Sequence, residues 1–396
     1  MSKKVLILGG GTAGTMTANS LAKMLKPELD AGKVELTMLS DNAKHIYKPG
    51  AMYVAFNKAY GNEFVKEQKS LLDIDVNFRL DGAVNIDFKK NEVTAKSGKK
   101  YQYDYLVLAV GCQAAPERIP GLKEAGDWFY TYEGAMKLAK KFKELKKGKV
   151  LVTVNFPKTP NIPHQCGIAP IETTLMLSDY LKENGVRDTV EIEYTYPKTA
   201  QKVTNGLFLQ EPTSEVLPMI YDMNNIKYTT SFTLAKVDPI KKIAYSEEGD
   251  SREFDILMST PPFIAPDVIR NSNISVALDN EGWVPTDRDT LKVKGLSNVY
   301  ALGDVVDLPI SKAGGSVHHQ QGVVAANIVG EIRGIGPTSH YDGKVIAVGQ
   351  LGLSCGMPLW YDYKEDVKPT PCTKVGSWMR LAFNKGVYWA SARGTI

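Results

Sequence analysis

The chain has 396 residues, of which 43% are hydrophobic and 23% charged, and its formal net charge is +4. This composition predicts a folded protein with enough material for two domains, and it excludes a disordered chain. No stretch approaches the ~20 apolar residues needed to cross a bilayer, and the first residues lack a signal-peptide pattern, so we expect a cytoplasmic protein. The densest run of lysines, 137–149, places Leu138, Phe142 and Leu145 at helical spacing. It predicts a solvated helix face and no nucleic-acid partner.

The first residues predict a site for a dinucleotide. A buried strand at 3–8 is followed by three glycines and then by a helical pattern. Such a turn brings backbone N–H groups and the start of the helix against a pyrophosphate. The predicted contacts are Gly9, Gly11, Thr12, Ala13 and Gly14.

Three later strand ends belong to the same predicted site. The strand at 33–40 ends in Ser40 and Asp41, where a ribose contact is expected, although the usual acidic residue is displaced by one position. A strand at 103–112 ends in Ala109 and Gly111, and one at 296–307 contains Gly303 and Asp304. After Asp304, the residues from 311 onward predict a helix whose first turn would face the cofactor, with Lys312 as a neighbouring charge.

The second half of the chain lacks a matching glycine loop. The strand at 149–156 runs into PKTPNIPHQCGIAPIE, which contains four prolines, Cys166 and Glu172. Proline has no N–H to offer a phosphate, so the segment argues against binding of NAD(P)H. The four cysteines, Cys112, Cys166, Cys355 and Cys372, form no CxxC pair, and we expect neither a metal site nor a secreted disulfide framework.

Taken together, these segments resemble the sulfide:quinone oxidoreductase family and its relative, the flavoprotein subunit of flavocytochrome c sulfide dehydrogenase. The resemblance also covers YKPGAMY at 47–53, which contains Lys48, and GQLGLSCGMP at 349–358, which contains Cys355. It implies bound FAD, with Asp304 on the ribityl chain and Lys312 at the pyrimidine edge. It further implies that Cys166 and Cys355 form a redox pair that hydrosulfide opens, that Glu172 moves protons there, and that electrons leave to a quinone.

Tyr130 marks a departure from that family. Many members carry a third cysteine at this point, and in some it bonds to the flavin, so the resemblance here implies noncovalent FAD. Cys112 follows the strand end at Gly111 and is a candidate substitute or an inert buried thiol. Cys372 receives no role beyond a surface or interface thiol.

The C-terminal residues 374–396 have two readings. Aromatic residues alternate with basic ones, as in helices that lie at a membrane surface, and Phe383 and Arg380 are then candidate quinone contacts. Gly386 interrupts the segment, which leaves open a closing strand of an α+β domain.

We expect an α/β protein with two tandem Rossmann-like, disulfide-reductase-like units and a small cap. The FAD unit would use 1–110 and 285–335, the second unit 111–284 and the cap 336–396. The expected activity is sulfide oxidation with a membrane quinone as acceptor, at the cytoplasmic side of the membrane and through peripheral attachment. Alternatives are a subunit that donates to a cytochrome and a type II NADH:quinone dehydrogenase; formation of a homo-oligomer is left open.

Overall fold

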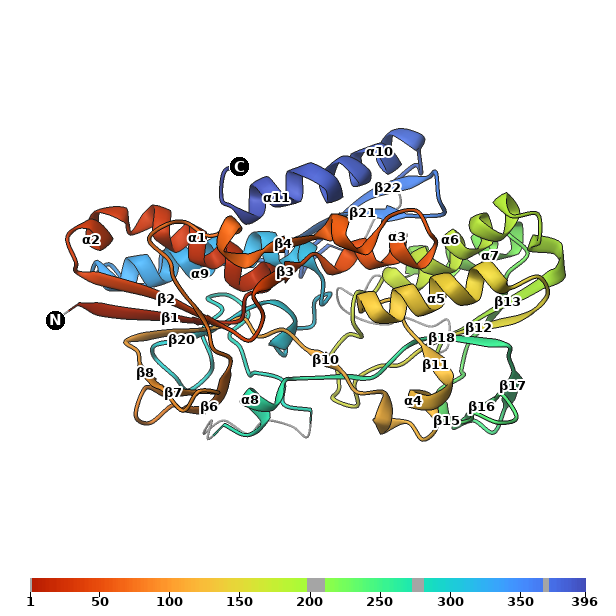
Figure 1. Ribbon diagram of the computed structural model, residues 1–396, viewed down its shortest axis with the longest axis horizontal. Helices are drawn as coiled ribbons and strands as arrows, with labels where there is room; N and C mark the ends of the chain where they lie inside the picture. The colour runs from red at the N-terminus through yellow and green to blue at the C-terminus, as the bar shows by residue number, and fades with distance from the viewer. Residues whose placement is uncertain (1, 198–210, 273–280, 366–369) are drawn as a thin grey trace.

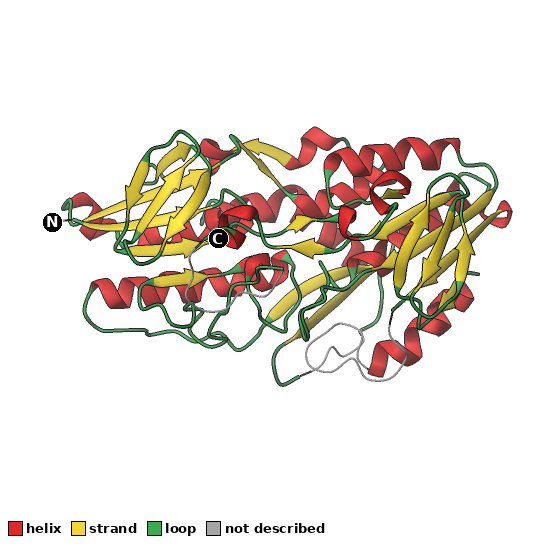
Figure 2. Cartoon of the chain, turned by 90° about the horizontal axis from the view of Figure 1, so that it is seen from below, coloured by secondary structure: helices red, strands yellow, loops and turns green. Residues whose placement is uncertain are grey.

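The computed structural model describes residues 2–197, 211–272, 281–365 and 370–396. Its strands gather toward both ends of an elongated molecule, and helices cover them (Figures 1 and 2). One hydrophobic core of buried side chains extends through both main sheets and the C-terminal segment.

A five-stranded parallel sheet forms the first unit, in the order β20-β9-β1-β2-β5. Its strands are β1 (Lys3–Leu8), β2 (Val34–Ser40), β5 (Asn77–Leu80), β9 (Tyr105–Leu108) and β20 (Val299–Ala301). Helices α1 (Thr12–Met24) and α9 (Gly314–Ile332) pack against one another beside it. Because β20 joins strands from the start of the chain, the first unit is assembled from distant parts of the sequence.

The turn between β1 and α1 requires glycine for steric reasons. Gly9 has a φ of +105°, in the left-handed region, and a Cβ on Gly14 would lie 1.9 Å from the Gly9 carbonyl oxygen. A side chain at either position would push the helix away from the strand. The predicted strand–turn–helix is confirmed.

A second five-stranded parallel sheet has the order β11-β18-β12-β13-β14. Its strands are β11 (Gly126–Asp127), β12 (Gly148–Val154), β13 (Val190–Thr195), β14 (Lys227–Thr229) and β18 (Ile256–Thr260). The helices of this unit are α5 (Tyr132–Glu144), α6 (Ala169–Glu183) and α7 (Glu211–Met223). In α5, Leu138 and Phe142 are buried while the lysines face outward, as the lysine-rich pattern predicted. The two parallel sheets confirm the expected α/β fold class, and the proposed residue limits of the units stay a prediction.

Small elements complete the two units. Antiparallel three-stranded sheets are formed by β6 (Ala83–Asp87), β7 (Glu92–Ala95) and β8 (Lys100–Gln102), and by β15 (Leu234–Asp238), β16 (Ile243–Ser246) and β17 (Ser251–Glu253). Two-stranded pairs are β3 (Lys44–Ile46) with β4 (Val65–Glu67) and β10 (Gln113–Ala114) with β19 (Phe263–Ile264). Short helices are α2 (Lys26–Asp30), α3 (Ala51–Ala55), α4 (Leu122–Ala125) and α8 (Asp267–Arg270), and 3₁₀ turns are η1 (Lys48–Gly50), η2 (Gly61–Phe64), η3 (Gln68–Leu71), η4 (Pro116–Arg118), η5 (Arg187–Thr189) and η6 (Gly303–Val305).

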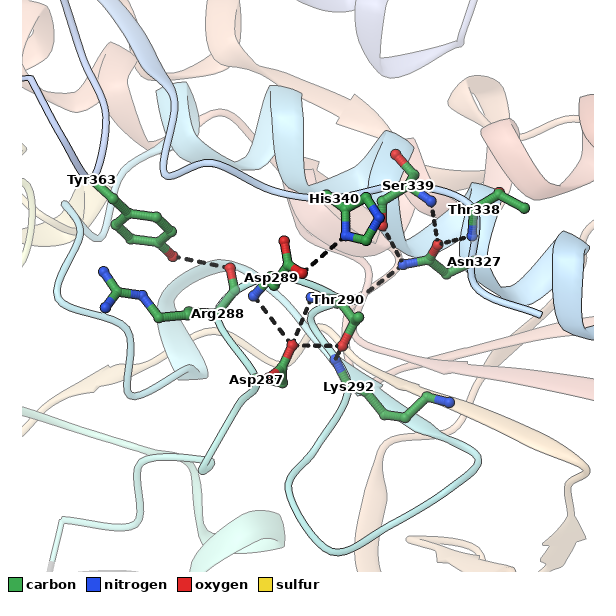
Figure 3. A network of polar contacts seen from close by, with 10 residues as sticks. All are labelled: Asp287, Arg288, Asp289, Thr290, Lys292, Asn327, Thr338, Ser339, His340 and Tyr363. Carbon is green, nitrogen blue, oxygen red and sulfur yellow. Dashed lines mark hydrogen bonds and ion pairs between the residues drawn. The ribbon is translucent and has the colours of Figure 1, made fainter.

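A polar network directs the chain out of the first unit and into the C-terminal segment (Figure 3). The side chain of Asn327, on α9, accepts hydrogen bonds from the N–H groups of Thr338 and Ser339 and donates to the carbonyl of Thr290. Asp287 accepts from the backbone N–H and hydroxyl of Thr290. These bonds satisfy the buried side-chain amide of Asn327 and attach the residues after α9 to this helix.

The C-terminal segment is a β-hairpin covered by a helix. The hairpin consists of β21 (Val345–Gln350) and β22 (Gly356–Tyr361), and α10 (Lys374–Ala382) lies against it. The helix continues through a π-helical turn (Phe383–Val387) into α11 (Tyr388–Ala392), and Figure 1 shows it running along one face of the molecule. The alternative of a closing strand is therefore wrong: the aromatic residues have helical spacing, and the π turn accommodates Gly386.

Candidate functional site

The glycine turn after β1 has the features of an anion site. A Cβ on Gly11 would meet no atom within 4 Å, so space remains in front of this turn. Gly11 is the N-cap of α1, and no side chain caps the first N–H groups of this helix. Across the turn, a Cβ on Gly303 would lie 3.2 Å from the Cβ of Ala13. Two of the predicted segments therefore meet at the start of α1, where backbone donors are available to a pyrophosphate.

The predicted ribose contacts occupy the rim of this turn. The hydroxyl of Ser40 is engaged with the backbone of Asn42, as donor to its carbonyl and acceptor from its N–H. Asp41 and Lys48 are exposed. Lys48 is close enough to the Gly111 end of β9 for its charge to act on the Cys112 thiol. The roles of Ser40, Asp41 and Lys48 stay predictions.

Gln165 joins the cysteine-bearing loop to Asp304. Its amide nitrogen donates to Asp304 Oδ2 at 2.8 Å and to the Lys312 carbonyl at 3.0 Å, while its amide oxygen lies 2.9 Å from the Cys112 sulfur. The Cys166 N–H donates to the Lys312 carbonyl as well. One buried amide thus ties together three parts of the predicted site that are far apart in sequence.

Cys166 adopts an unusual backbone conformation within this loop. Its φ is +46°, in the region that side-chain-bearing residues rarely adopt. Besides the bonds of Gln165, the Tyr130 hydroxyl donates to the Gln165 carbonyl at 3.0 Å. Strained backbone of this kind persists where the surroundings hold it, and it is common at functional sites.

A buried ion pair lies beyond Cys166. Glu172, in the first turn of α6, is 1% exposed, and its Oε1 accepts from Arg380 at 2.6 Å and from the Gln350 N–H at 2.6 Å. Burial, and then the negative charge of Glu172, raise the pKa of the Cys166 thiol to about 12, against the opposing charge of Arg380. The thiol is therefore neutral near pH 7 in this structure.

The predicted bond between Cys166 and Cys355 is not formed. Cys355 is disulfide-bonded to Cys372, with a Cα–Cα distance of 5.5 Å, and Cys166 is free. Leu353, two residues before Cys355, donates its N–H to Asp179 on α6. The Gln350 N–H donates to Glu172 in the first turn of α6, so residues 350–353 run along this helix, and Cys355 lies opposite Leu351 in the hairpin. Sequence spacing does not reveal which cysteines the fold brings together, and here the partner of Cys355 is Cys372. The expectation that Cys372 is a lone surface or interface thiol is therefore wrong.

Arg380 and Phe383 point inward. Besides its bond to Glu172, the Arg380 guanidinium donates to the Val348 carbonyl and lies 3.4 Å from the Met52 sulfur. All three contacts lie on the inner side of the C-terminal helix. Phe383 is partly buried, with its ring 5.5 Å from that of His318. Both residues line the inner side of the C-terminal helix, and neither contact tests their assignment to a quinone.

Lys312 is also more enclosed than its sequence context suggested. Its ammonium group donates to the carbonyls of Asp304 and Val306 and lies 3.9 Å from the ring centroid of Trp283. Burial lowers its pKa to about 8. These contacts brace the turn that carries Asp304, and a role as a charge beside a cofactor stays a prediction.

Sequence reasoning missed a link between the C-terminal helix and the glycine turn. The Tyr388 hydroxyl lies 2.8 Å from the Thr12 hydroxyl and 2.6 Å from His45 Nε2. His45 Nδ1 lies 3.0 Å from the Gly10 carbonyl. Tyr388 and His45 carry no motif, and only the helical packing of residues 388–392 brings them to this turn.

In the second unit, the Glu281 carboxylate accepts hydrogen bonds from the loop after β12, where a phosphate loop would be expected. After β12, the N–H groups of Lys158 and Thr159 donate to Glu281 at 2.8 and 3.0 Å, and the Thr159 hydroxyl donates to the same carboxylate. Trp283 also donates to it. Donors that would bind a phosphate are therefore occupied by a negative group of the chain itself.

Replacing Gln165 tests its link to Asp304. In Gln165→Leu, a side chain of similar size would leave the Asp304 carboxylate without its donor, and we expect Cys166 to react with iodoacetamide about tenfold faster because its loop loosens. The measurement is the alkylation rate of Cys166 by peptide mass spectrometry. The control is Gln321→Leu, which alters the side-chain amide of a different residue, on α9. Equal alkylation rates of Cys166 in the two variants would contradict the role assigned to Gln165.

The fold and the glycine turn define a class of protein. The family model described as pyridine nucleotide-disulphide oxidoreductase matches residues 3–154, which contain the first parallel sheet except β20. Within the described residues, no group of three or more His, Cys, Asp or Glu side chains is arranged to hold a metal ion. No helix in the described part of the chain is both long and apolar enough to cross a membrane.

Particular relatives narrow this class. The chain is 26% identical to the mitochondrial sulfide:quinone oxidoreductase of Dictyostelium discoideum, over 86% of this chain and 73% of that protein. It is 25% identical to the sulfide-quinone reductase of Aquifex aeolicus, over 100% of this chain and 93% of that protein. The X-ray structure of the Aquifex aeolicus sulfide:quinone oxidoreductase has a TM-score of 0.84 at 24% identity and covers 99% of this chain and 92% of its own. The resemblance inferred from the sequence is thereby confirmed.

Proposed function

We propose that this protein oxidises sulfide with FAD as the electron acceptor in the site and passes the electrons to a quinone. The observation that carries the proposal is the placement of Cys166: its loop is hydrogen-bonded to the Gly303–Asp304 turn, and Gly303 lies against the start of α1. A free thiol thus lies beside the proposed site for FAD. The resemblance to sulfide:quinone oxidoreductases supports the same conclusion.

The residues present fit FAD. The open space at Gly11 and the uncapped start of α1 suit the pyrophosphate, and Asp304 suits the ribityl hydroxyls. When bound, FAD would supply an acceptor for two electrons. Among the described residues of the second unit, Glu281 occupies the N–H groups of Lys158 and Thr159 that a phosphate would need, which disfavours the alternative of an NADH:quinone dehydrogenase.

Cys166 would receive the sulfur. A new S–S bond would join the hydrosulfide sulfur to the Cys166 sulfur, and bound FAD would supply the acceptor for the two electrons released. The two S–H protons must leave, and we infer that the carboxylate of Glu172, whose charge acts on the Cys166 thiol, accepts one of them. Because its pKa is raised to about 12, the thiol reacts only after losing its proton, and the rate of sulfide oxidation should rise with pH across the neutral range.

Anaerobic titration of the purified yellow protein tests the proposal. Sulfide is expected to bleach the flavin absorbance within the turnover time, whereas NADH at the same concentration should bleach it at least about a hundredfold more slowly, because Glu281 occupies the backbone donors after β12 that a second dinucleotide would need. Rapid bleaching by NADH would overturn the proposal in favour of a dehydrogenase. Bleaching by neither would leave a flavoprotein of another activity.

The FAD is expected to be noncovalent. Tyr130 stands where a flavin-linking cysteine would be, and its hydroxyl is engaged with Gln165 and Thr260. Acid precipitation should therefore release the yellow colour into the supernatant. Colour retained in the protein pellet would show a covalent bond and direct attention to Cys112, the other free cysteine.

A membrane surface is proposed as the place of electron exit. The C-terminal helix exposes Val375, Trp378, Met379 and Leu381, and the hairpin exposes Ile346 and Trp360 as a cross-strand pair. Aromatic and aliphatic side chains beside basic ones suit the interface of a bilayer. We propose peripheral attachment through this surface at the cytoplasmic side, with Phe383 and Arg380 beneath it toward the quinone.

A further inference from the structure

A buried chain of hydrogen bonds connects the C-terminal helix to the glycine turn after β1. The side chain of Tyr388 is 1% exposed and that of His45 is completely buried. The Tyr388 hydroxyl lies within hydrogen-bond distance of both the Thr12 hydroxyl and His45 Nε2, and His45 Nδ1 reaches the Gly10 carbonyl. Groups from three segments far apart in sequence therefore share one network under the turn.

The direction of each hydrogen bond in this chain can be assigned. Burial lowers the pKa of His45, so its ring is neutral near pH 7 and carries a single N–H. Nδ1 faces two acceptors, the Gly10 carbonyl at 3.0 Å and the Gln68 side-chain oxygen at 3.3 Å, so the proton is on Nδ1. Nε2 then accepts from the Tyr388 hydroxyl, and the Tyr388 oxygen accepts from the Thr12 hydroxyl.

This assignment fixes the orientation of the peptide that joins Gly10 to Gly11. The Gly10 carbonyl points into the protein, where it accepts from His45 and, at 3.3 Å, from the Thr15 hydroxyl. In a planar trans peptide the C=O and N–H groups point in opposite directions, so the N–H of Gly11 points away from this network. The chain thus keeps a carbonyl away from the predicted pyrophosphate and turns a donor toward it.

The C-terminal helix is attached to α1 at further points. The Asn19 amide donates to the Ala392 carbonyl at 2.6 Å, and the Lys23 ammonium donates to the Gly394 carbonyl at 2.5 Å. Tyr388 is the first residue of α11 and directly follows the π-helical turn, a local irregularity that is frequent at functional sites. Residues 388–394 therefore lie along the helix whose start forms the predicted cofactor site.

We propose that Tyr388 and His45 are positioning residues for bound FAD, so that docking of the C-terminal helix and occupancy of the glycine turn stabilise one another. Thermodynamic linkage makes this coupling reciprocal: if the docked helix strengthens FAD binding, bound FAD holds the helix more firmly by the same factor. This coupling rests on the proposed function only for FAD as the dinucleotide. It also joins the cofactor to the helix that exposes the proposed membrane surface.

Release of FAD from the holoprotein tests the first half of the coupling. Tyr388→Phe keeps the ring, whose centroid lies 3.9 Å from that of Tyr47, and loses the hydrogen bonds to Thr12 and His45. We expect FAD to dissociate about tenfold faster from this variant. The measurement is the rise of FAD fluorescence after high dilution of the holoprotein. Release at the wild-type rate would overturn the inference.

Two further variants separate positioning from general loss of stability. Tyr180→Phe removes the hydroxyl of another buried tyrosine, which contacts Asn57, and should release FAD at the wild-type rate. His45→Phe should accelerate release because the Gly10 carbonyl loses a donor, and the double variant with Tyr388→Phe should be no faster than the faster single variant. Equal acceleration in Tyr180→Phe, or effects of the two single variants that multiply in the double variant, would overturn the inference.

Hydrogen exchange tests the reciprocal half. Full-length protein stripped of FAD is compared with the same protein after FAD is restored, and exchange is followed by peptide mass spectrometry. We expect FAD to slow exchange in residues 388–396 about tenfold in the wild type and no more than about twofold in Tyr388→Phe. Wild-type protein that sulfide bleaches, but in which FAD does not protect this segment, would overturn the inference alone. Protein that shows the protection, but whose flavin sulfide does not bleach, would overturn the proposed function alone.

Discussion

Cys166→Ser is expected to slow sulfide-driven reduction of the flavin by at least about a thousandfold while FAD stays bound, because the serine hydroxyl cannot form the sulfur–sulfur bond. The glycine turn and Asp304, which the proposal assigns to the cofactor, are untouched by the substitution. Stopped-flow absorbance under anaerobic conditions measures the rate, and the visible spectrum of the purified protein reports FAD content.

Cys355→Ser is the informative comparison for that experiment. Cys355 is bonded to Cys372, while Cys166 is free, so the loss of Cys355 should leave most of the flavin reduction in place. A loss as large as that of Cys166→Ser would mean that the two cysteines work as one pair in another conformation. Full sulfide turnover in Cys166→Ser would falsify the assignment of Cys166.

Arg380→Met is expected to lower the free energy of unfolding by ~3 kcal/mol, because it leaves the Glu172 carboxylate buried without its cation. The pair is well enclosed: the side chains of Arg380 and Glu172 are 12% and 1% exposed. Since Arg380 lowers the pKa of Cys166, the variant should also alkylate more slowly at pH 8. Urea denaturation measures the first effect and peptide mass spectrometry the second.

Lys385→Met is the matched control for this variant. Lys385 pairs with Glu63 on the surface, with side-chain exposures of 50% and 30%, and removal of such a pair should cost less than ~1 kcal/mol. The double variant Glu172→Gln/Arg380→Met should regain part of the stability, since neither charge is then left alone. If the losses of stability in Glu172→Gln and Arg380→Met, each measured alone, simply add in the double variant, Glu172 and Arg380 are not a coupled pair.

Local pattern determined much of the first unit. The strand before Gly9, the glycine spacing and the helix after it follow from steric rules within a dozen residues, so the turn could be predicted without a neighbour in space. The run of prolines after β12 likewise indicated that a phosphate loop is missing. It could not indicate that Glu281, more than a hundred residues later, would occupy the donors of that segment.

The tertiary structure decided which distant residues became partners. Spacing along the chain carries no information on which cysteines form a disulfide. The packing of α10 against β22 brings Cys355 and Cys372 together as a disulfide, and Cys166 is free. The Glu172–Arg380 pair and the link from Tyr388 to Thr12 also depend on the C-terminal helix folding back over both units. By itself, the sequence determined the elements and the residue types available for chemistry, because these follow from local sterics and periodicity. Their pairing was decided by the packed fold, because it depends on contacts between different elements, 17 residues apart for Cys355 and Cys372 and 376 apart for Thr12 and Tyr388.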